Sequence, residues 1–160
     1  MTIGSVPRHM SEVETSIDID APPEQVWELA MDPDRLADWV TIHRRLDDHS
    51  DGRLRAGYEM EQTLCLRGVN FKVKWELVRC EHPFHAEWHG RGPARSHAET
   101  EYRLSGNDSG GTRFGYRNEF RAPLGALGAV ASRAIVGGLP RREADASLRR
   151  LKALAERNGG

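Results

Sequence analysis

Apolar and polar residues alternate from residue 13 to residue 20, a period of two that is typical of a strand with one buried face. The next segment places Pro23 where a helix can begin and follows it with acidic and then apolar residues. Asp32, Pro33 and Asp34 repeat this order and predict a second short helix that runs through Trp39. We therefore expect a first strand followed by two short helices.

Residues 41–121 show only strand and turn patterns, and the pairing register of one hairpin follows from the position of its turn and the match of apolar and charged residues. With Arg67 and Gly68 at the turn, one face pairs Leu66 with Val69, Leu64 with Phe71, Gln62 with Val73, Met60 with Trp75, and Tyr58 with Leu77. The other face pairs Thr63 with Lys72 and Glu61 with Lys74, and it leaves one like-charge pair, Glu59 with Glu76. Because apolar meets apolar and opposite charges meet, we expect this register.

A second hairpin is predicted to turn at residues 106–111. In it Leu104, Tyr102 and Thr100 are expected to face Thr112, Phe114 and Tyr116. A shorter strand at residues 85–91 lies between the two hairpins.

The pattern becomes helical near the C-terminus, where Ala144, Leu148, Leu151 and Ala155 form one apolar stripe between Pro140 and the end signal Asn158-Gly159. The preceding segment, 125–138, consists of small residues, and its glycines together with Pro140 predict a kink or break. These elements indicate an α+β fold in which a curved antiparallel sheet of about seven strands wraps a long C-terminal helix. We expect a single domain over residues 13–157 and a flexible tail over residues 1–12.

Composition narrows the classes of function. The net charge of the 160 residues is −1, which gives no electrostatic reason to expect a nucleic-acid partner. The longest weakly polar run, 122–139, is interrupted by Arg133 and several glycines and is too short for a membrane span. Without a secretory signal in residues 1–12 and with only Cys65 and Cys80, we expect a cytoplasmic protein with two free thiols, Cys65 opposite Asn70 and Cys80 near Arg55.

A sheet wrapped around a helix with small side chains should leave unfilled volume, and its wall would be mostly apolar, as in small-molecule pockets. The candidate ligand-binding residues share an inward position; they are Tyr58, Met60, Gln62, Leu64, Phe71, Val73, Trp75, Trp88, Thr100, Tyr102, Phe114, Tyr116, Asn118, Leu127, Val130 and Ala134. The alternative is that these residues close-pack as core. Gln62 and Asn118 carry more information, because a buried amide implies a local hydrogen bond, a water or a ligand.

Metal binding and catalysis find less support in the sequence. His85 and His89 share a strand face but lie about 13 Å apart along it, too far for one ion, so the histidines are expected to face solvent and no metal site is predicted. No nucleophile, phosphate-loop or zinc-protease motif is present, and no cofactor is expected. Acid–base catalysis is the alternative, with Tyr58, Tyr102 or Tyr116 as proton donor and Arg133 polarising a carbonyl.

The order of elements, together with DAPPEQVWELAMDPDRLADW at residues 20–39, resembles the START-like (SRPBCC) superfamily, which includes pollen allergens, lipid-transfer domains and polyketide cyclases. DWVTIHRRL and RGVNFKVKWELVRCEHP resemble an actinobacterial branch described as toxins of type II toxin–antitoxin pairs. The resemblance implies a helix-grip fold that carries a small hydrophobic or aromatic ligand, with an antitoxin as a candidate partner. A cyclase or dehydratase is the alternative, although residues 37–43 lack the aromatic–proline stretch of the cyclases.

Overall fold

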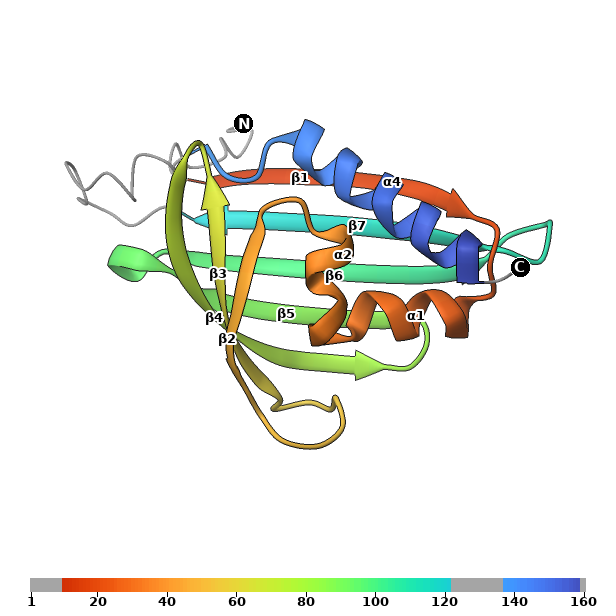
Figure 1. Ribbon diagram of the computed structural model, residues 1–160, viewed down its shortest axis with the longest axis horizontal. Coiled ribbons are helices and arrows are strands. Elements are labelled where there is room, and N and C mark those ends of the chain that lie inside the picture. Colours follow the sequence, from red (N-terminus) through yellow and green to blue (C-terminus); the bar gives the residue numbers. More distant parts are fainter. Residues whose placement is uncertain (1–9, 122–136, 159–160) are drawn as a thin grey trace, which may run out of the picture.

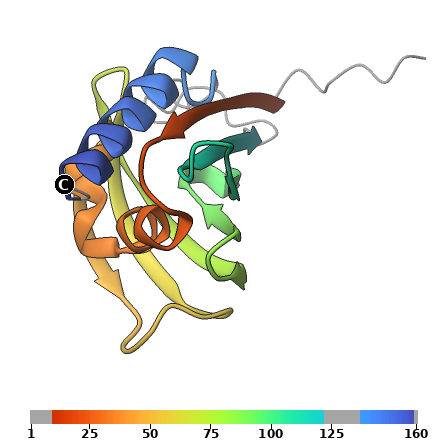
Figure 2. The same cartoon turned by 90° about the vertical axis from the view of Figure 1, so that its right-hand side faces the viewer.

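A computed structural model of the chain describes residues 10–121 and 137–158. Its strands form one antiparallel sheet in the order β1-β7-β6-β5-β4-β3-β2, and the helices lie against one side of the curved sheet (Figure 1, Figure 2). The strands are β1 (Met10–Ile19), β2 (His43–His49), β3 (Glu59–Leu66), β4 (Val69–Glu81), β5 (His85–Arg91), β6 (His97–Gly106) and β7 (Thr112–Arg121). The helices are α1 (Pro23–Met31), α2 (Leu36–Trp39) and α4 (Arg141–Asn158), with 3-10 turns η1 (Pro33–Arg35) and η2 (Pro93–Arg95). The predicted α+β helix-grip fold with a seven-stranded sheet is confirmed.

The two short helices form where their start signals predict them. Asp32 ends α1 and also caps η1, because its Oδ1 accepts a hydrogen bond of 2.9 Å from the backbone N–H of Asp34. The side chains of Val26 and Trp39 are almost fully buried, so the apolar stripes of α1 and α2 face the sheet.

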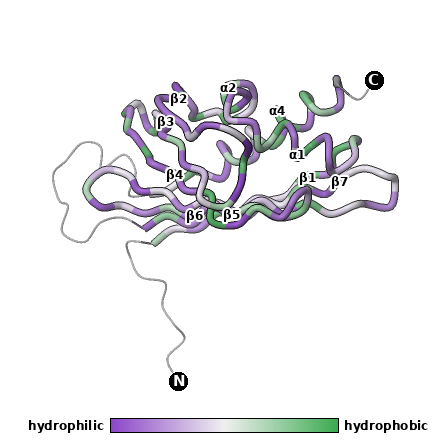
Figure 3. The backbone as a smooth tube through the Cα atoms, turned by 90° about the horizontal axis from the view of Figure 1, so that it is seen from below, coloured by the Kyte–Doolittle hydropathy of each residue, from purple (hydrophilic) through white to green (hydrophobic). Residues whose placement is uncertain are grey.

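The predicted register of the first hairpin is confirmed at all of its pairs from Leu66–Val69 to Glu59–Glu76. Met60 and Trp75 are therefore direct neighbours, and both are buried on the helix side of the sheet. Glu59 and Glu76 are both exposed, so water screens their repulsion. Hydrophilic and hydrophobic residues alternate along these strands (Figure 3).

The register expected for the second hairpin is wrong by two residues. Leu104 pairs with Phe114 and Tyr102 pairs with Tyr116, rather than with Thr112 and Phe114. The cause is the turn after β6, where Asn107 Oδ1 accepts hydrogen bonds from the N–H groups of Ser109 and Gly111 and closes a loop that begins only after Gly106. A shift of two residues leaves every side chain on its expected face.

The chain ends of the domain differ in part from expectation. β1 begins at Met10, so residues 10–12 belong to a strand that pairs with β7 and not to a tail. α4 runs beside β1 and buries Ala144, Leu148, Leu151 and Ala155, as predicted (Figure 1). Residues 137–140 are not helical, which confirms the break before α4, whereas the rest of the small-residue segment lies outside the described residues.

Both cysteines are free, as predicted, and both are partly buried. Cys65 lies opposite Asn70, as predicted, and Cys80 pairs with Ala86 on β5. The pairing of β3 with β4 ends at Glu59 and Glu76, before it reaches Cys80. No helix within residues 10–121 and 137–158 is long and apolar enough to cross a membrane.

Candidate ligand cavity

The sheet, α2 and α4 line a partly open cavity of about 110 Å³. Four strands and two helices contribute most of its wall, since inward positions on β3, β4, β6 and β7 converge beneath α2 and α4. Predicted residues in the wall are Met60, Gln62, Leu64, Phe71, Val73, Trp75, Trp88, Thr100, Tyr102, Tyr116 and Asn118. Their role in binding stays a prediction.

The remaining candidates do not lie in the described cavity wall. Tyr58 and Phe114 are buried in the core, where Tyr58 packs edge-on against Trp88 and Phe114 packs against Tyr102 with ring centroids 5.4 Å apart. Leu127, Val130, Ala134 and Arg133 lie outside the described residues.

Sequence reasoning placed Leu127, Val130 and Ala134 at the helix side of the cavity but missed the helix residues that the structure describes there. The additional wall residues include Met31, Leu36, Trp39, Ala144, Ser147 and Leu148 from the helices, Ala98 and Phe120 from the sheet, and Ser96 from the end of η2. The apolar stripes of the helices were visible in the sequence, but they were assigned to general packing. Their opposition to the inward strand residues would have placed them at the cavity.

Gln62 connects the cavity wall to the edge of the sheet. The Nε1–H of Trp75 donates to Gln62 Oε1 at 2.9 Å, and because an indole nitrogen can only donate, this contact fixes the orientation of the amide. The amide Nε2 of Gln62 therefore donates to Nδ1 of His43 at 2.8 Å. His43 must accept at Nδ1, so its neutral form carries the proton on Nε2. Burial lowers the pKa of His43, which agrees with a neutral ring.

Asn118 also has a protein partner, because its Nδ2 donates to Thr100 Oγ1 at 2.8 Å. The ring of Tyr116 stacks on that of Tyr102 with centroids 6.0 Å apart, and Tyr102 contacts Trp39 edge-on at 5.9 Å. Burial raises the pKa of both tyrosines far above the usual value of 10, although hydrogen bonding to Thr100 and Asn118 opposes the rise at Tyr116. Both phenols stay protonated at neutral pH and can donate hydrogen bonds.

Two polar atoms in the cavity wall have no hydrogen-bond partner among the residues described. They are Nε1 of Trp39 and Oγ of Ser96, and each of these residues is only 1% exposed. A buried polar group without a partner costs roughly 1–3 kcal/mol, so such atoms are rare and call for an explanation. No Lys, Arg, Asp or Glu is found in the described part of the wall.

Gly90 sets the position of Trp75. A Cβ atom on Gly90 would lie 2.7 Å from Cε3 and Cζ3 of Trp75 and 2.8 Å from Cγ1 of Val73, closer than real Cβ contacts. The two residues are direct neighbours on β5 and β4. The missing side chain therefore makes room for the indole ring on the floor of the cavity.

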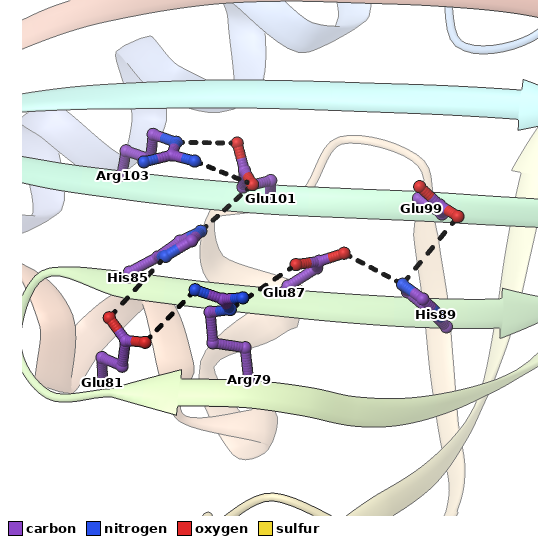
Figure 4. A network of polar contacts seen from close by, with 8 residues as sticks. All are labelled: Arg79, Glu81, His85, Glu87, His89, Glu99, Glu101 and Arg103. Atoms are coloured by element: carbon purple, nitrogen blue, oxygen red, sulfur yellow. Dashed lines mark hydrogen bonds and ion pairs between the residues drawn. The ribbon is translucent and has the colours of Figure 1, made fainter.

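The opposite face of the sheet carries charged side chains from β4, β5 and β6 (Figure 4). His85 was expected to face solvent, but it is only 8% exposed, and its Nε2 lies 3.1 Å from Glu101 Oε2. Carboxylates from both neighbouring strands flank the ring, Glu81 on β4 and Glu101 on β6. Although His85 and His89 are too far apart along β5 to share one ion, each has carboxylates beside it.

A family model described as polyketide cyclase / dehydrase and lipid transport matches residues 10–156. The chain belongs to this family. The chain is 32% identical over 74 residues to Toxin Rv0910 of Mycobacterium tuberculosis, a match that covers 46% of this chain. The chain spans about half the length of that relative, 51%.

Solved structures show the same fold for other proteins. TTHA0849 from Thermus thermophilus matches with a TM-score of 0.73 at 18% identity, covering 94% of this chain and 100% of that one. The Zhui aromatase/cyclase from Streptomyces sp. R1128 matches with a TM-score of 0.67 at 19% identity, covering 94% and 96%. At these identities the likeness concerns the fold alone.

Proposed function

We propose that this polyketide cyclase/dehydrase family member binds a small, uncharged, mainly apolar molecule in the cavity between its sheet and α4. The observation that carries the proposal is the concave wall of apolar and aromatic side chains, in whose described part no carboxylate, lysine or arginine is present. In that described part only His97 can carry a charge, so a charged ligand would find few partners there, and an unpaired buried charge is costly. The volume of about 110 Å³ is of the order of the ~150 Å³ apolar cavity known to bind benzene, so a single-ring compound matches it in size.

The polar atoms of the wall support a ligand with a hydrogen-bond acceptor. The indole N–H of Trp39 can only donate, and it has no partner in the described part of the chain. A carbonyl or ether oxygen on the ligand would satisfy it. The protonated phenol of Tyr102 is a further donor in the wall, whereas that of Tyr116 already has Thr100 and Asn118 as partners.

An enzymatic reaction is the alternative, suggested by the description of the family and by the similarity in fold to an aromatase/cyclase. A general acid works best when its pKa lies near the working pH. Because burial raises the pKa of Tyr102 and Tyr116, these phenols are weaker acids than in water, which favours binding over proton transfer.

The proposal can be tested with a fluorescent hydrophobic dye and with native mass spectrometry of protein purified from its own host. Ala98 lines the cavity from β6, and Ala98→Phe should fill it and abolish dye binding while the circular-dichroism spectrum stays unchanged. Ser105→Phe, on the exposed end of the same strand, is the matched control and should bind as the wild type does. Equal dye binding by wild type and Ala98→Phe would exclude this cavity as the site.

The similarity to Toxin Rv0910 supports a second candidate function, as the toxin of a toxin–antitoxin pair. Such a toxin would act in the cytoplasm, a location that the two free cysteines favour. Inducible expression in its host, with and without the product of the adjacent gene, tests this directly. Growth arrest that the neighbouring product relieves is the expected result, and unchanged growth in both cases would exclude the toxin function.

A further inference from the structure

A row of acidic residues crosses the outer face of the sheet, on the side away from the cavity. Strand pairing places Glu59 opposite Glu76, Glu76 opposite His89, His89 opposite Glu99, and Glu99 opposite Glu119. Like charges on directly opposite residues are destabilising. Arg117 and Arg121 pair with Glu119, but within residues 10–121 and 137–158 no Lys or Arg forms an ion pair with Glu76 or Glu99.

His89 lies between two carboxylates in this region (Figure 4). Its Nε2 is 3.0 Å from Glu87 Oε1 on the same strand and 3.9 Å from Glu99 Oε1 on β6. The ligand atoms of the three residues all lie within 4.8 Å of one another. The three ligand atoms form a triangle with sides of 3.0, 3.9 and at most 4.8 Å. If the third side is 4.8 Å, the point equidistant from the three atoms lies about 2.4 Å from each, close to the ~2.0–2.2 Å of zinc–nitrogen and zinc–oxygen bonds. Shifts of a few tenths of an ångström would complete the coordination.

We propose that Glu87, His89 and Glu99 bind a divalent transition-metal ion of the Zn²⁺ class. One imidazole nitrogen and two carboxylate oxygens form a ligand set that suits such ions better than Mg²⁺ or Ca²⁺, which take oxygen ligands. The three side chains are 27%, 45% and 43% exposed, so water can reach the ion and fill its remaining positions. The bound charge would also relieve the repulsion along the acidic row.

Arg79 contacts one of the proposed metal ligands without being a ligand itself. Its Nε lies 3.9 Å from Oε2 of Glu87, while the other oxygen, Oε1, is the one that approaches His89. Arg79 also donates from Nη1 to Glu81 Oε1 at 3.3 Å, so the guanidinium lies between two carboxylates and leaves Oε1 of Glu87 free to face the proposed ion.

A neighbouring group, His85, Glu87 and Glu101, has similar spacing but is less suited to a metal ion. Arg103 donates two hydrogen bonds to the Glu101 carboxylate, at 2.9 and 3.4 Å, and an ion would have to displace this guanidinium. His85 is buried, with Glu81 3.9 Å from its second ring nitrogen. The two groups share only Glu87, so substitutions distinguish them.

Isothermal titration calorimetry of the full chain, purified without a histidine tag, tests the site with ZnCl₂. We expect saturable binding of one ion, weakened tenfold or more in His89→Ala and in Glu99→Gln. Glu101→Gln belongs to the neighbouring group, and His49→Ala lies on β2, and both should bind as the wild type does. Zn²⁺ should also raise the thermal unfolding midpoint of the wild type but not of His89→Ala.

Several results would overturn the proposal. These are the absence of saturable Zn²⁺ binding, equal affinity in wild type and His89→Ala, or an equal loss of affinity in Glu101→Gln. The first two would leave His89 as the partner of surface ion pairs only, and the third would move the ion to the neighbouring group. Because Glu99→Gln keeps the size of the side chain, a folded variant is available even if His89→Ala unfolds.

Discussion

Replacing Gly90 by alanine should displace Trp75 and so damage the cavity from its floor. The new methyl group would lie 2.7 Å from two ring carbons of Trp75, whereas carbon atoms in contact need about 3.5–4.0 Å. The ring would therefore move by about 1 Å. Its hydrogen bond to Gln62, now 2.9 Å, would be stretched or lost, and the ring would shift into the cavity.

The expected loss of stability follows from these contacts. Forcing an extra methyl group into a packed core costs roughly 1–3 kcal/mol, and losing a hydrogen bond adds about 1 kcal/mol. Since 1 kcal/mol corresponds to roughly 2–4 °C in a chain of this size, the unfolding midpoint should fall by about 4–16 °C. Dye affinity should fall as well, because the shifted indole occupies cavity volume.

Thermal unfolding by circular dichroism and dye titration measure the two effects. Gly115→Ala is the matched control: Gly115 is also a strand glycine, but its Cβ would meet only Arg103 atoms at 3.5 Å or more. It should therefore leave both quantities nearly unchanged. If Gly90→Ala unfolds at the wild-type temperature, or if both alanines cost the same, then Gly90 does not set the position of Trp75.

Three further predictions use other contacts. Gln62→Glu should raise the pKa of His43 above 6.5, because a carboxylate accepts a hydrogen bond from Nδ1–H and favours the imidazolium. An NMR titration that shows no rise in this pKa would contradict the contact between the two side chains. In the wild type the pKa of His43 is lowered on folding, so stability should decrease as the pH falls below about 6.5, with a weaker decrease in His43→Gln by urea denaturation. Thr112→Val should cost roughly 1–3 kcal/mol, because the Ala21 carbonyl loses its buried partner at 2.6 Å, and an unchanged urea midpoint would show that water replaces it.

The sequence predicted the first hairpin well because several constraints agree there. A two-residue turn at Arg67 and Gly68 fixes which residues of β3 and β4 pair, and the opposite charges on the outer face exclude a shifted register. At the second hairpin the turn is longer, and the side chain of Asn107 decides where pairing begins. That choice depends on hydrogen bonds within the loop, which alternation alone does not reveal.

The inward residues were predictable because strand alternation survives a shift of two residues, and so the faces of Tyr102 and Tyr116 were placed correctly. The hydrogen bonds of Gln62 were not predictable, because its partner His43 lies on β2, and bulges interrupt the pairing of β2 with β3. The outer cluster was missed for a related reason. Its ligand atoms meet across β5 and β6, and a count along one strand cannot show that Glu99 faces His89.

The alternation of β5 has a consequence for how this protein can change. Trp88 points to the cavity, while Glu87 and His89 on either side of it point to the opposite face. Substitutions at the outer positions can alter the surface charge without changing the volume or lining of the cavity. Substitutions at the inner positions can reshape the cavity and leave the surface intact. One strand thus carries two sets of properties that mutation and selection can vary separately.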